Sequence, residues 1–481
     1  MKRTLSLKCN MALNAFKSIL NIIFPLITFP YVSKILGIDN IGKYNFSSSV
    51  VSYFVLFSEL GISTYAIREG AKIRKSELIK TFSNEMFSIN ILSTLISYIL
   101  LGISLIYIPK FQEYNCIILI LSISILFRTI GMEWIYSIYE DYLYITIRSI
   151  VIQVLSLVLL FVFVKSKDDL LYYSFLSVFS GAFTGILNFV HARKYCKIHF
   201  TLNMNCKKHL KPILVLFGMS ATVTIYVSSD TTILGFMCSD KIVGQYAVSV
   251  KIYTIVKTIL SSVLVVSIPR ISAILSEHDK IKLNMALEDI YKTLLTFLFP
   301  AIIGLIILRR SVILFISSEE FIGATSSLVL LAIALFFCMG AWFWGQCVLV
   351  PLNEEVKVFK VTVVSAVINI VLNLLLIPFW KENAAALTTI IAEAISYFYC
   401  MYCGRKQIGN LVILRTVKKI SVGSIGIILV CGIVRFVVRN EIWCLACSII
   451  LSIVVYIVIE IILNNEVIGD FFLNITKNRG E

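Results

Sequence analysis

The chain has few charged residues and no long stretch polar enough to fold in water. Of its 481 residues only 15% are charged, whereas 58% are hydrophobic. Soluble domains are about one-quarter charged. Apolar runs of about twenty residues recur along the whole chain, which is the length that crosses a bilayer as a helix. The composition therefore excludes a soluble enzyme and predicts a helical protein that spans a membrane many times.

Motifs for catalysis, ATP hydrolysis and metal binding are also missing or poorly placed. No glycine-rich phosphate loop of the P-loop kind occurs, which argues against direct drive by ATP. The histidines have no catalytic partner motif, and all are expected in cytoplasmic loops. They are His191, His199, His209 and His278. Two Cys-x-x-Cys pairs lie in or beside apolar runs, where helix packing is a better interpretation than zinc. These pairs are Cys400 with Cys403 and Cys444 with Cys447. We therefore expect no enzyme, no metal and no cofactor.

The apolar runs number about fourteen and form two blocks of six and a final pair. We expect the spans at 11–35, 44–67, 82–108, 116–139, 143–164, 170–190, 213–236, 243–268, 291–308, 323–350, 361–379, 384–402, 420–438 and 442–463. The predicted fold is an all-α polytopic membrane protein. Its expected parts are an N-terminal lobe at 1–193, a cytoplasmic linker loop at 194–211, a C-terminal lobe at 212–404, and two extra helices with a cytoplasmic tail at 405–481.

The positive charges predict the orientation of these spans. The chain carries a formal net charge of +15. Its Lys and Arg residues gather in alternate loops, and such loops stay in the cytoplasm. This pattern places the N-terminus and the C-terminus in the cytoplasm. The basic charge is then explained by topology and by attraction to anionic lipid headgroups, not by nucleic acid.

A short pattern occurs twice, about two hundred residues apart. Leu36-Gly37 is followed by Gly42 and Tyr44, and Leu234-Gly235 is followed by Gly244 and Tyr246. Glycine near the end of a helix permits a left-handed exit from it. Because each copy sits between the first two spans of a six-span block, we predict two parallel repeats with a cavity between them that supports alternating access.

The residues of this pattern belong to a larger set of motifs. The set comprises 36–44, Glu59-Leu60-Gly61, Tyr65 to Glu69, Gly131-Met132-Glu133-Trp134 with Glu140, 230–246, Asn369 with Asn373, Ile377-Pro378, Ala384-Ala385-Ala386 and Glu393. In order and spacing it resembles the polysaccharide flippases, which export O-antigen or capsule repeat units and belong to the MATE-like multidrug/oligosaccharidyl-lipid/polysaccharide superfamily. The chain departs from that family's pattern at 380–383, where members commonly carry glycines.

The resemblance implies a two-lobed bundle in the bacterial cytoplasmic membrane. Such a protein moves undecaprenyl-diphosphate-linked oligosaccharide from the cytoplasmic to the outer leaflet for O-antigen, lipopolysaccharide or capsule synthesis. Membrane lipids and the polysaccharide polymerase machinery are further expected partners.

Basic residues inside predicted spans are the first candidates for a substrate site. A lipid diphosphate carries about two negative charges across some 30 Å of hydrocarbon, and cations in a wet cavity can replace part of its hydration. Lys17, Arg128, Lys251 and Lys257 are the cations that we assign to this site. Snorkelling of these side chains to an interface is the alternative interpretation.

Acidic residues inside spans are candidates for coupling transport to a proton or Na⁺ gradient. These residues are Glu133, Asp230 and Glu393. Asp230 and Lys251 are expected at similar depth, so an ion pair between them is plausible. A buried bridge that only locks two helices together is an equal alternative.

Three other functions share parts of this pattern. A MATE-type drug or ion antiporter typically has twelve spans and an acidic cavity. A flippase for peptidoglycan lipid precursors shares the architecture. A membrane glycan polymerase usually presents a large outward loop, whereas the outward loops expected here are short. Spans thirteen and fourteen and the inward cations favour the flippase of polysaccharide repeat units.

Overall fold

The structure is a computed structural model that describes residues 7–277 and 279–469, with side chains described from residue 23 onward. Every regular element in those ranges is a helix, and twelve of the helices are long and apolar enough to cross a bilayer. The chain is therefore an all-α, multi-pass membrane protein, as its composition predicts.

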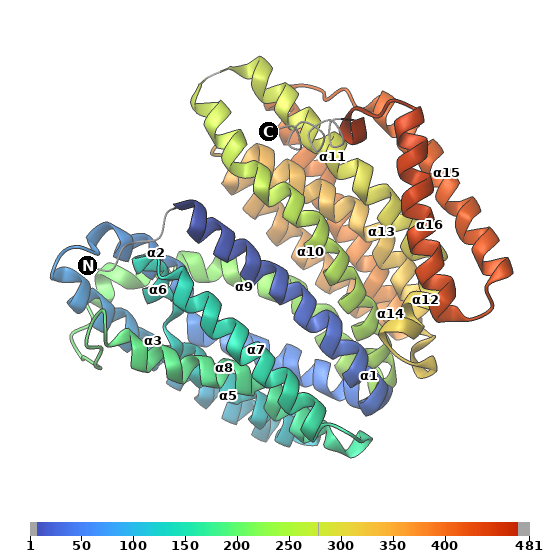
Figure 1. Cartoon of the computed structure of the whole chain (residues 1–481). Helices are drawn as coiled ribbons and strands as arrows, with labels where there is room; N and C mark the ends of the chain where they lie inside the picture. Colours follow the sequence, from blue (N-terminus) through green and yellow to red (C-terminus); the bar gives the residue numbers. More distant parts are fainter. Residues whose placement is uncertain (1–6, 278, 470–481) are drawn as a thin grey trace. The chain divides into compact units, whose positions relative to one another are not determined.

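Two of the twelve helices are long enough for two crossings. Helices α1 (Leu7–Glu59) and α14 (Glu355–Ile408) have 53 and 54 residues. At about 1.5 Å per residue each would measure about 80 Å, more than twice the hydrocarbon core. Each is interrupted once, at Gly37 (φ 75°, ψ 175°) and at Lys381 (φ 49°, ψ −129°). The breaks fall between predicted spans, so the helices are consistent with about fourteen crossings. Figure 1 shows α1 and α14 among the other helices.

Glycine, not proline, interrupts the first helix. Pro25 and Pro30 both lie inside α1, yet Gly37 is its non-helical position. The left-handed exit predicted for the repeated motif is therefore present at Gly37. In the second copy the prediction is wrong, because Gly235 lies inside α9 and has no positive φ. Lys381 lies in the segment where the chain departs from the family pattern, and there a side chain occupies a backbone conformation that glycine adopts more easily.

The chain divides into two compact units, Met1–Gly244 and Gln245–Glu481. After α1, unit 1 contains α2 (Ile62–Ile73), α3 (Leu78–Tyr107), α4 (Pro109–Glu113), α5 (Asn115–Gly131), α6 (Glu133–Tyr139), α7 (Tyr142–Phe163), η1 (Lys167–Asp169), α8 (Leu170–Ala192) and α9 (Cys206–Met237). Helix α1 packs on α3, α5, α7 and α9. The predicted linker at 194–211 and the predicted lobe limit at 404 stay predictions. Helix α9, which was expected in the C-terminal lobe, packs on α1 and α2 of unit 1.

Small residues bring α5 and α8 close together in unit 1. A Cβ added at Gly185 would lie 2.5 Å from the carbonyl oxygen of Phe127, and one at Gly131 would lie 3.3 Å from the Cα of Gly185. Close backbone approach is the usual way to pack helices in lipid, where apolar side chains gain little by leaving the bilayer. The α5–α8 pair forms one wall of the cavity described below.

Unit 2 begins within α10 (Asp240–Ser276) and continues through α11 (Lys280–Ile307), α12 (Arg309–Ile316), η2 (Glu319–Phe321), α13 (Ala324–Trp342), the π-helix η3 (Phe343–Leu349), α14, α15 (Leu414–Val437) and α16 (Glu441–Ile462). Helix α13 packs on α14, and α15 packs on α16 and α11. Trp344 and Phe343 of η3 are fully buried and lie beside Tyr291 of α11. The last two helices therefore belong to the body of unit 2.

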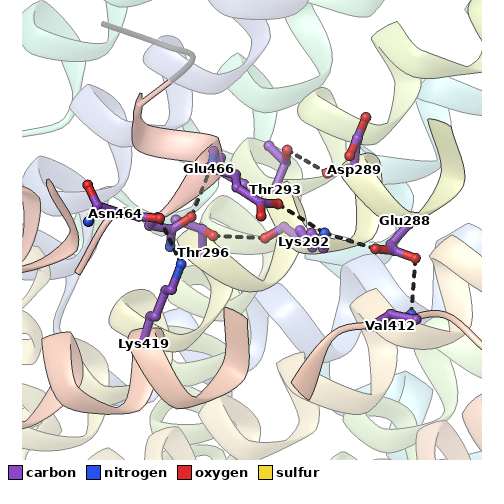
Figure 2. Close-up of polar contacts among 11 residues, drawn as sticks. Glu288, Asp289, Lys292, Thr293, Thr296, Val412, Lys419, Asn464 and Glu466 are labelled. Carbon is purple, nitrogen blue, oxygen red and sulfur yellow. Dashed lines mark hydrogen bonds and ion pairs between the residues drawn. The ribbon is translucent and has the colours of Figure 1, made fainter. Parts of the chain in front are cut away.

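A polar network joins the segment after α16 to α11 (Figure 2). The Lys292 ammonium lies 2.9 Å from a Glu288 oxygen and 3.1 Å from a Glu466 oxygen. The Val412 N–H donates to Glu288 over 3.1 Å, and Lys419 donates to the carbonyl oxygen of Asn464 over 2.7 Å. Lys292 therefore connects the segment after α16, through Glu466, with the segment before α15, through Glu288 and Val412.

Candidate functional site

Unit 1 contains a cavity of about 480 Å³ whose lining mixes polar and apolar side chains. Eight hydroxyl-bearing side chains line it, together with one acid and one base. The hydroxyls belong to Tyr44, Ser48, Ser52, Ser124, Ser177, Ser180, Ser220 and Thr224, and the charges to Glu59 and Arg128. The lining comes from α1, α5, α8 and α9. Such a concentration of polar groups within membrane-spanning helices is costly unless it meets water or a polar ligand.

Helical periodicity places these side chains on common faces. Ser48 and Ser52 are four residues apart on α1, and Glu59 follows seven residues later. Ser124 and Arg128 are four apart on α5. Residues three, four or seven apart share one face of a helix. Ser220 and Thr224 of α9 repeat the spacing, which the sequence shows and which predicts a polar stripe on an otherwise apolar helix.

Arg128 and Glu59 form the charged part of the lining. Arg128 Nη1 donates to Glu59 Oε1 over 2.9 Å, and the two side chains are 59% and 42% exposed. Arg128, predicted from the sequence as a cation of the substrate site, is therefore paired with an acid. The pair remains accessible, so unused guanidinium donors and a carboxylate oxygen face the cavity.

Several hydroxyls of the cavity are available to a ligand. Ser52 contacts Ser228 at 3.0 Å, and Ser124 donates to its own helix. Ser177 donates to the Ser174 carbonyl and is also hydrogen-bonded to Tyr44. The side chains of the remaining serines and of the threonine make no hydrogen bond within the described ranges. A hydroxyl both donates and accepts, so this lining suits a ligand that carries many hydroxyl groups.

The predicted cations do not all lie in this cavity. Lys17 falls in the part of α1 whose side chains are outside the described residues. Lys251 and Lys257 are half-buried on α10 in unit 2. Lys257 lies over the Tyr253 ring at 5.7 Å. Of the three cations whose side chains are described, only Arg128 lies in the hydroxyl-lined cavity.

Lys257 has acidic and thiol neighbours. Cys338 of α13 and Glu393 of α14 both interact electrostatically with it, and both are buried. The structure thus brings together two residues that we predicted for different roles, Lys257 for substrate and Glu393 for ion coupling. Their roles stay predictions.

Glu133 has a partner that points to a structural role. The buried Arg148, 3% exposed, donates to Glu133 Oε1 over 3.0 Å and also to the side-chain oxygen of Asn188. Helices α6, α7 and α8 are joined by this contact. Asp230 is buried on α9 in unit 1, whereas Lys251 belongs to unit 2, so the predicted pair between them stays a prediction.

Two histidines were wrongly expected in loops. His191 lies in the last turn of α8 and stacks on Tyr144, with 3.8 Å between the ring centroids. His209 is buried within α9, where Tyr65 Oη lies 2.9 Å from its Nδ1 and Glu85 Oε2 lies 3.0 Å from its Nε2. Asn205 also donates to Glu85, over 2.5 Å. No local motif reveals this cluster, because its partners lie more than one hundred residues away in sequence. It fastens the start of α9 to α2 and α3.

Unit 2 contains a second cavity, of about 720 Å³, that is almost entirely apolar. Its lining comes mainly from α11, α15 and α16, and includes Phe297, Pro300, Ile427, Leu445 and Ile453. Hydrocarbon is the chemistry that such a surface accepts. Within the described ranges no group of three or more His, Cys, Asp or Glu side chains could hold a metal ion.

Comparison with known proteins agrees with these features. The profile of the family described as "Polysaccharide biosynthesis protein" matches residues 7–275, more than half of the chain. The chain belongs to this family. One relative of this chain is the proposed O-antigen transporter of Escherichia coli strain K12, which is 24% identical to it over 397 residues. The match covers 81% of this chain and 95% of the relative. The lipid II flippase MurJ of Thermosipho africanus is 26% identical over 199 residues, 40% of either chain.

Solved structures show that this family member has the MATE-like fold. Lipid II flippase MurJ in an inward closed conformation superposes with a TM-score of 0.78 at 19% identity, covering 94% of this chain and 99% of the other. An inward-facing multidrug transporter of the MATE family gives 0.58 at 15% identity, covering 83% and 98%. The resemblance that the motifs predict is confirmed for the family and the fold.

Proposed function

We propose that the protein is a flippase that moves undecaprenyl-diphosphate-linked oligosaccharide across the bacterial cytoplasmic membrane by alternating access, for O-antigen or capsule synthesis. The observation that carries this proposal is the hydroxyl-lined cavity of unit 1, with its Arg128–Glu59 pair, inside membrane-spanning helices. The family match and the O-antigen transporter relative support it.

Each cavity, taken by itself, suits the chemistry of one end of such a substrate. A glycan headgroup must leave water, and each polar group that lacks a hydrogen bond in a dry environment costs several kcal/mol, roughly 2–7. The hydroxyls of unit 1 offer replacement hydrogen bonds. The apolar cavity of unit 2 offers a surface for the hydrocarbon chain. A soluble metabolite has no hydrocarbon chain that could occupy the apolar cavity of unit 2.

The diphosphate requires positive charge, and we assign this task to Lys251 and Lys257 of α10, with Lys17 as a further candidate. Glu393, beside Lys257, is the proposed coupling carboxylate for a proton or Na⁺. Diphosphate binding to Lys257 would release Glu393 to take up a cation, which would link the two events.

The test is a strain that lacks the gene. We expect surface polysaccharide to disappear while its lipid-linked repeat unit accumulates on the cytoplasmic side. Repeat units that reach the outer leaflet but stay unpolymerised would instead support a polymerase. Arrest of peptidoglycan synthesis with normal surface polysaccharide would support the flippase of peptidoglycan precursors.

A further inference from the structure

We propose that the cavity of unit 1 is a sugar-binding site that accepts an uncharged sugar and rejects a sugar acid. This inference rests on the proposed function, because it assigns one part of the glycan to one cavity. It adds a substrate class, neutral hexoses and related uncharged sugars, and two residues that determine it, Glu59 and Arg128.

The charge of the lining is the first observation. Among the described residues that line the cavity only Glu59 and Arg128 are charged, and they are paired at 2.9 Å. This described part of the lining therefore has a formal net charge of zero. No lining residue of α8 or α9 carries a charge. Arg128 is thus already neutralised and offers no free positive charge to an anion.

The hydrogen-bonding groups are the second observation. The eight hydroxyls come from four helices and surround the ion pair. Arginine has five N–H donors, of which Glu59 takes one here, and Glu59 has a second carboxylate oxygen. An uncharged sugar presents alternating donors and acceptors that match such a lining. The volume of about 480 Å³ lies within the range of small-ligand sites, about 300–1,000 Å³.

A sugar carboxylate would meet an unfavourable environment in the same place. It would add a third charge to a balanced pair, so one negative charge would have no counter-charge among the described residues of the lining. It would compete with Glu59 for Arg128 and be repelled by Glu59. Charge juxtaposition of this kind is how binding sites exclude close analogues.

The experiment compares two probes that differ only at C6 of one sugar. They are a short-chain polyprenyl diphosphate linked to glucose and the same carrier linked to glucuronate. Binding to the purified full-length protein in lipid nanodiscs is measured by calorimetry. We expect glucose to bind at least about tenfold more tightly, a difference of about 1.4 kcal/mol.

Variants of the pair test the cause. Glu59→Gln leaves Arg128 without its partner, so we expect the preference for glucose to shrink or reverse. Arg128→Gln leaves Glu59 alone, so glucuronate should bind still more weakly. The variant that combines Glu59→Gln with Arg128→Gln carries neither charge and should keep a preference for glucose. It replaces the single variants in the test if one unpaired charge prevents folding. Glu140→Gln is the matched control, because Glu140 pairs with Arg74 at 2.7 Å in the same unit but outside the cavity.

Two results would overturn the inference. One is equal binding of both probes, or tighter binding of glucuronate, by the unaltered protein. The other is a preference that Glu59→Gln changes no more than Glu140→Gln does. Binding of neither probe would contradict the proposed function as well, whereas binding of both with equal affinity would leave the flippase function standing and remove only the selectivity.

Discussion

Gly244 lies with its Cα against the main-chain carbonyl of Ile38, and a Cβ added there would be 2.2 Å from that oxygen. The reverse contact also exists, since a Cβ at Gly42 would lie 2.0 Å from the carbonyl oxygen of Asp240. Ile38 lies four residues before Gly42, and Asp240 lies four residues before Gly244. Each glycine therefore contacts the equivalent carbonyl in the other copy of the repeated motif. Reciprocal contacts of this kind arise at a two-fold axis, so they are consistent with the predicted duplication.

Alanine at either of these glycines should therefore damage the protein. Gly42→Ala and Gly244→Ala each force a methyl group into a main-chain carbonyl that cannot move aside cheaply. We expect a loss of about 1–3 kcal/mol, the usual range for overpacking. Thermal unfolding in detergent measures it. Gly102→Ala in α3 is the control, because nothing lies within 4 Å of a Cβ there. Equal behaviour of all three variants would contradict the close contact.

The helices are predictable from sequence, whereas the polar contacts between them are not. Each apolar run predicts a span by its own length, and the Leu36-Gly37 motif predicts the turn at Gly37 by local backbone preference. The Arg128–Glu59 pair joins residues that are 69 positions apart on different helices, so no local sequence pattern predicts it. The stripe of hydroxyls could have been found, since Ser48, Ser52, Ser220 and Thr224 recur at helical spacing.

Two arginines inside spans should respond differently to substitution. Arg148 is 3% exposed and Arg128 is 59% exposed, although each is paired with one glutamate. Without Arg148 the buried side-chain oxygen of Asn188 loses its hydrogen-bond donor, and a cavity opens. Arg148→Met should therefore lower the free energy of unfolding by about 1–3 kcal/mol. Exposed pairs contribute less than about 1 kcal/mol, so Arg128→Met should barely change stability.

Export and protein level distinguish these two roles. Arg128→Met should lower polysaccharide export at a normal protein level, whereas Arg148→Met should lower the level itself. A thiol-reactive dye can follow unfolding, because several cysteines are buried. Reversal of the two outcomes would place the functional arginine at Arg148.

Lys381 should tolerate glycine better than lysine. Its φ of 49° with ψ of −129° lies in a region that costs a side chain about 1–3 kcal/mol. Glycine avoids that strain but loses more entropy on folding, about 0.5–1 kcal/mol. We expect Lys381→Gly to stabilise by about 1 kcal/mol in thermal unfolding. The control is Lys360→Gly in the helical part of α14, which should destabilise by about the same amount. A loss at both positions would show that Lys381 is not strained.

His209 should be required for stability rather than for transport chemistry. His209→Phe would leave the Glu85 carboxylate and the Tyr65 hydroxyl without one buried partner each, at a cost of about 1–3 kcal/mol for each unsatisfied group. Thermal unfolding and protein level report the loss. The exposed His199, which contacts Asn84, is the comparison. If His199→Phe were equally harmful, burial of His209 would not explain the effect.

The contact between Glu466 and Lys292 should make a small, acid-sensitive contribution to stability. The hydrogen bond and charge of Lys292 lower the pKa of Glu466 below its ordinary value of about 4.3. A carboxyl with a lowered folded-state pKa stabilises the fold above its unfolded pKa and loses this effect as pH falls through the folded pKa. Because Glu466 is 69% exposed, the contribution should stay below about 1 kcal/mol. Glu466→Gln should therefore lower the unfolding temperature slightly and equally at pH 6 and pH 8, and not at all near pH 3. In a Lys292→Met background the same substitution should have a smaller effect, because only the charges of Lys419 and Arg415 then favour the Glu466 carboxylate. An undiminished loss there would assign the stability to another contact.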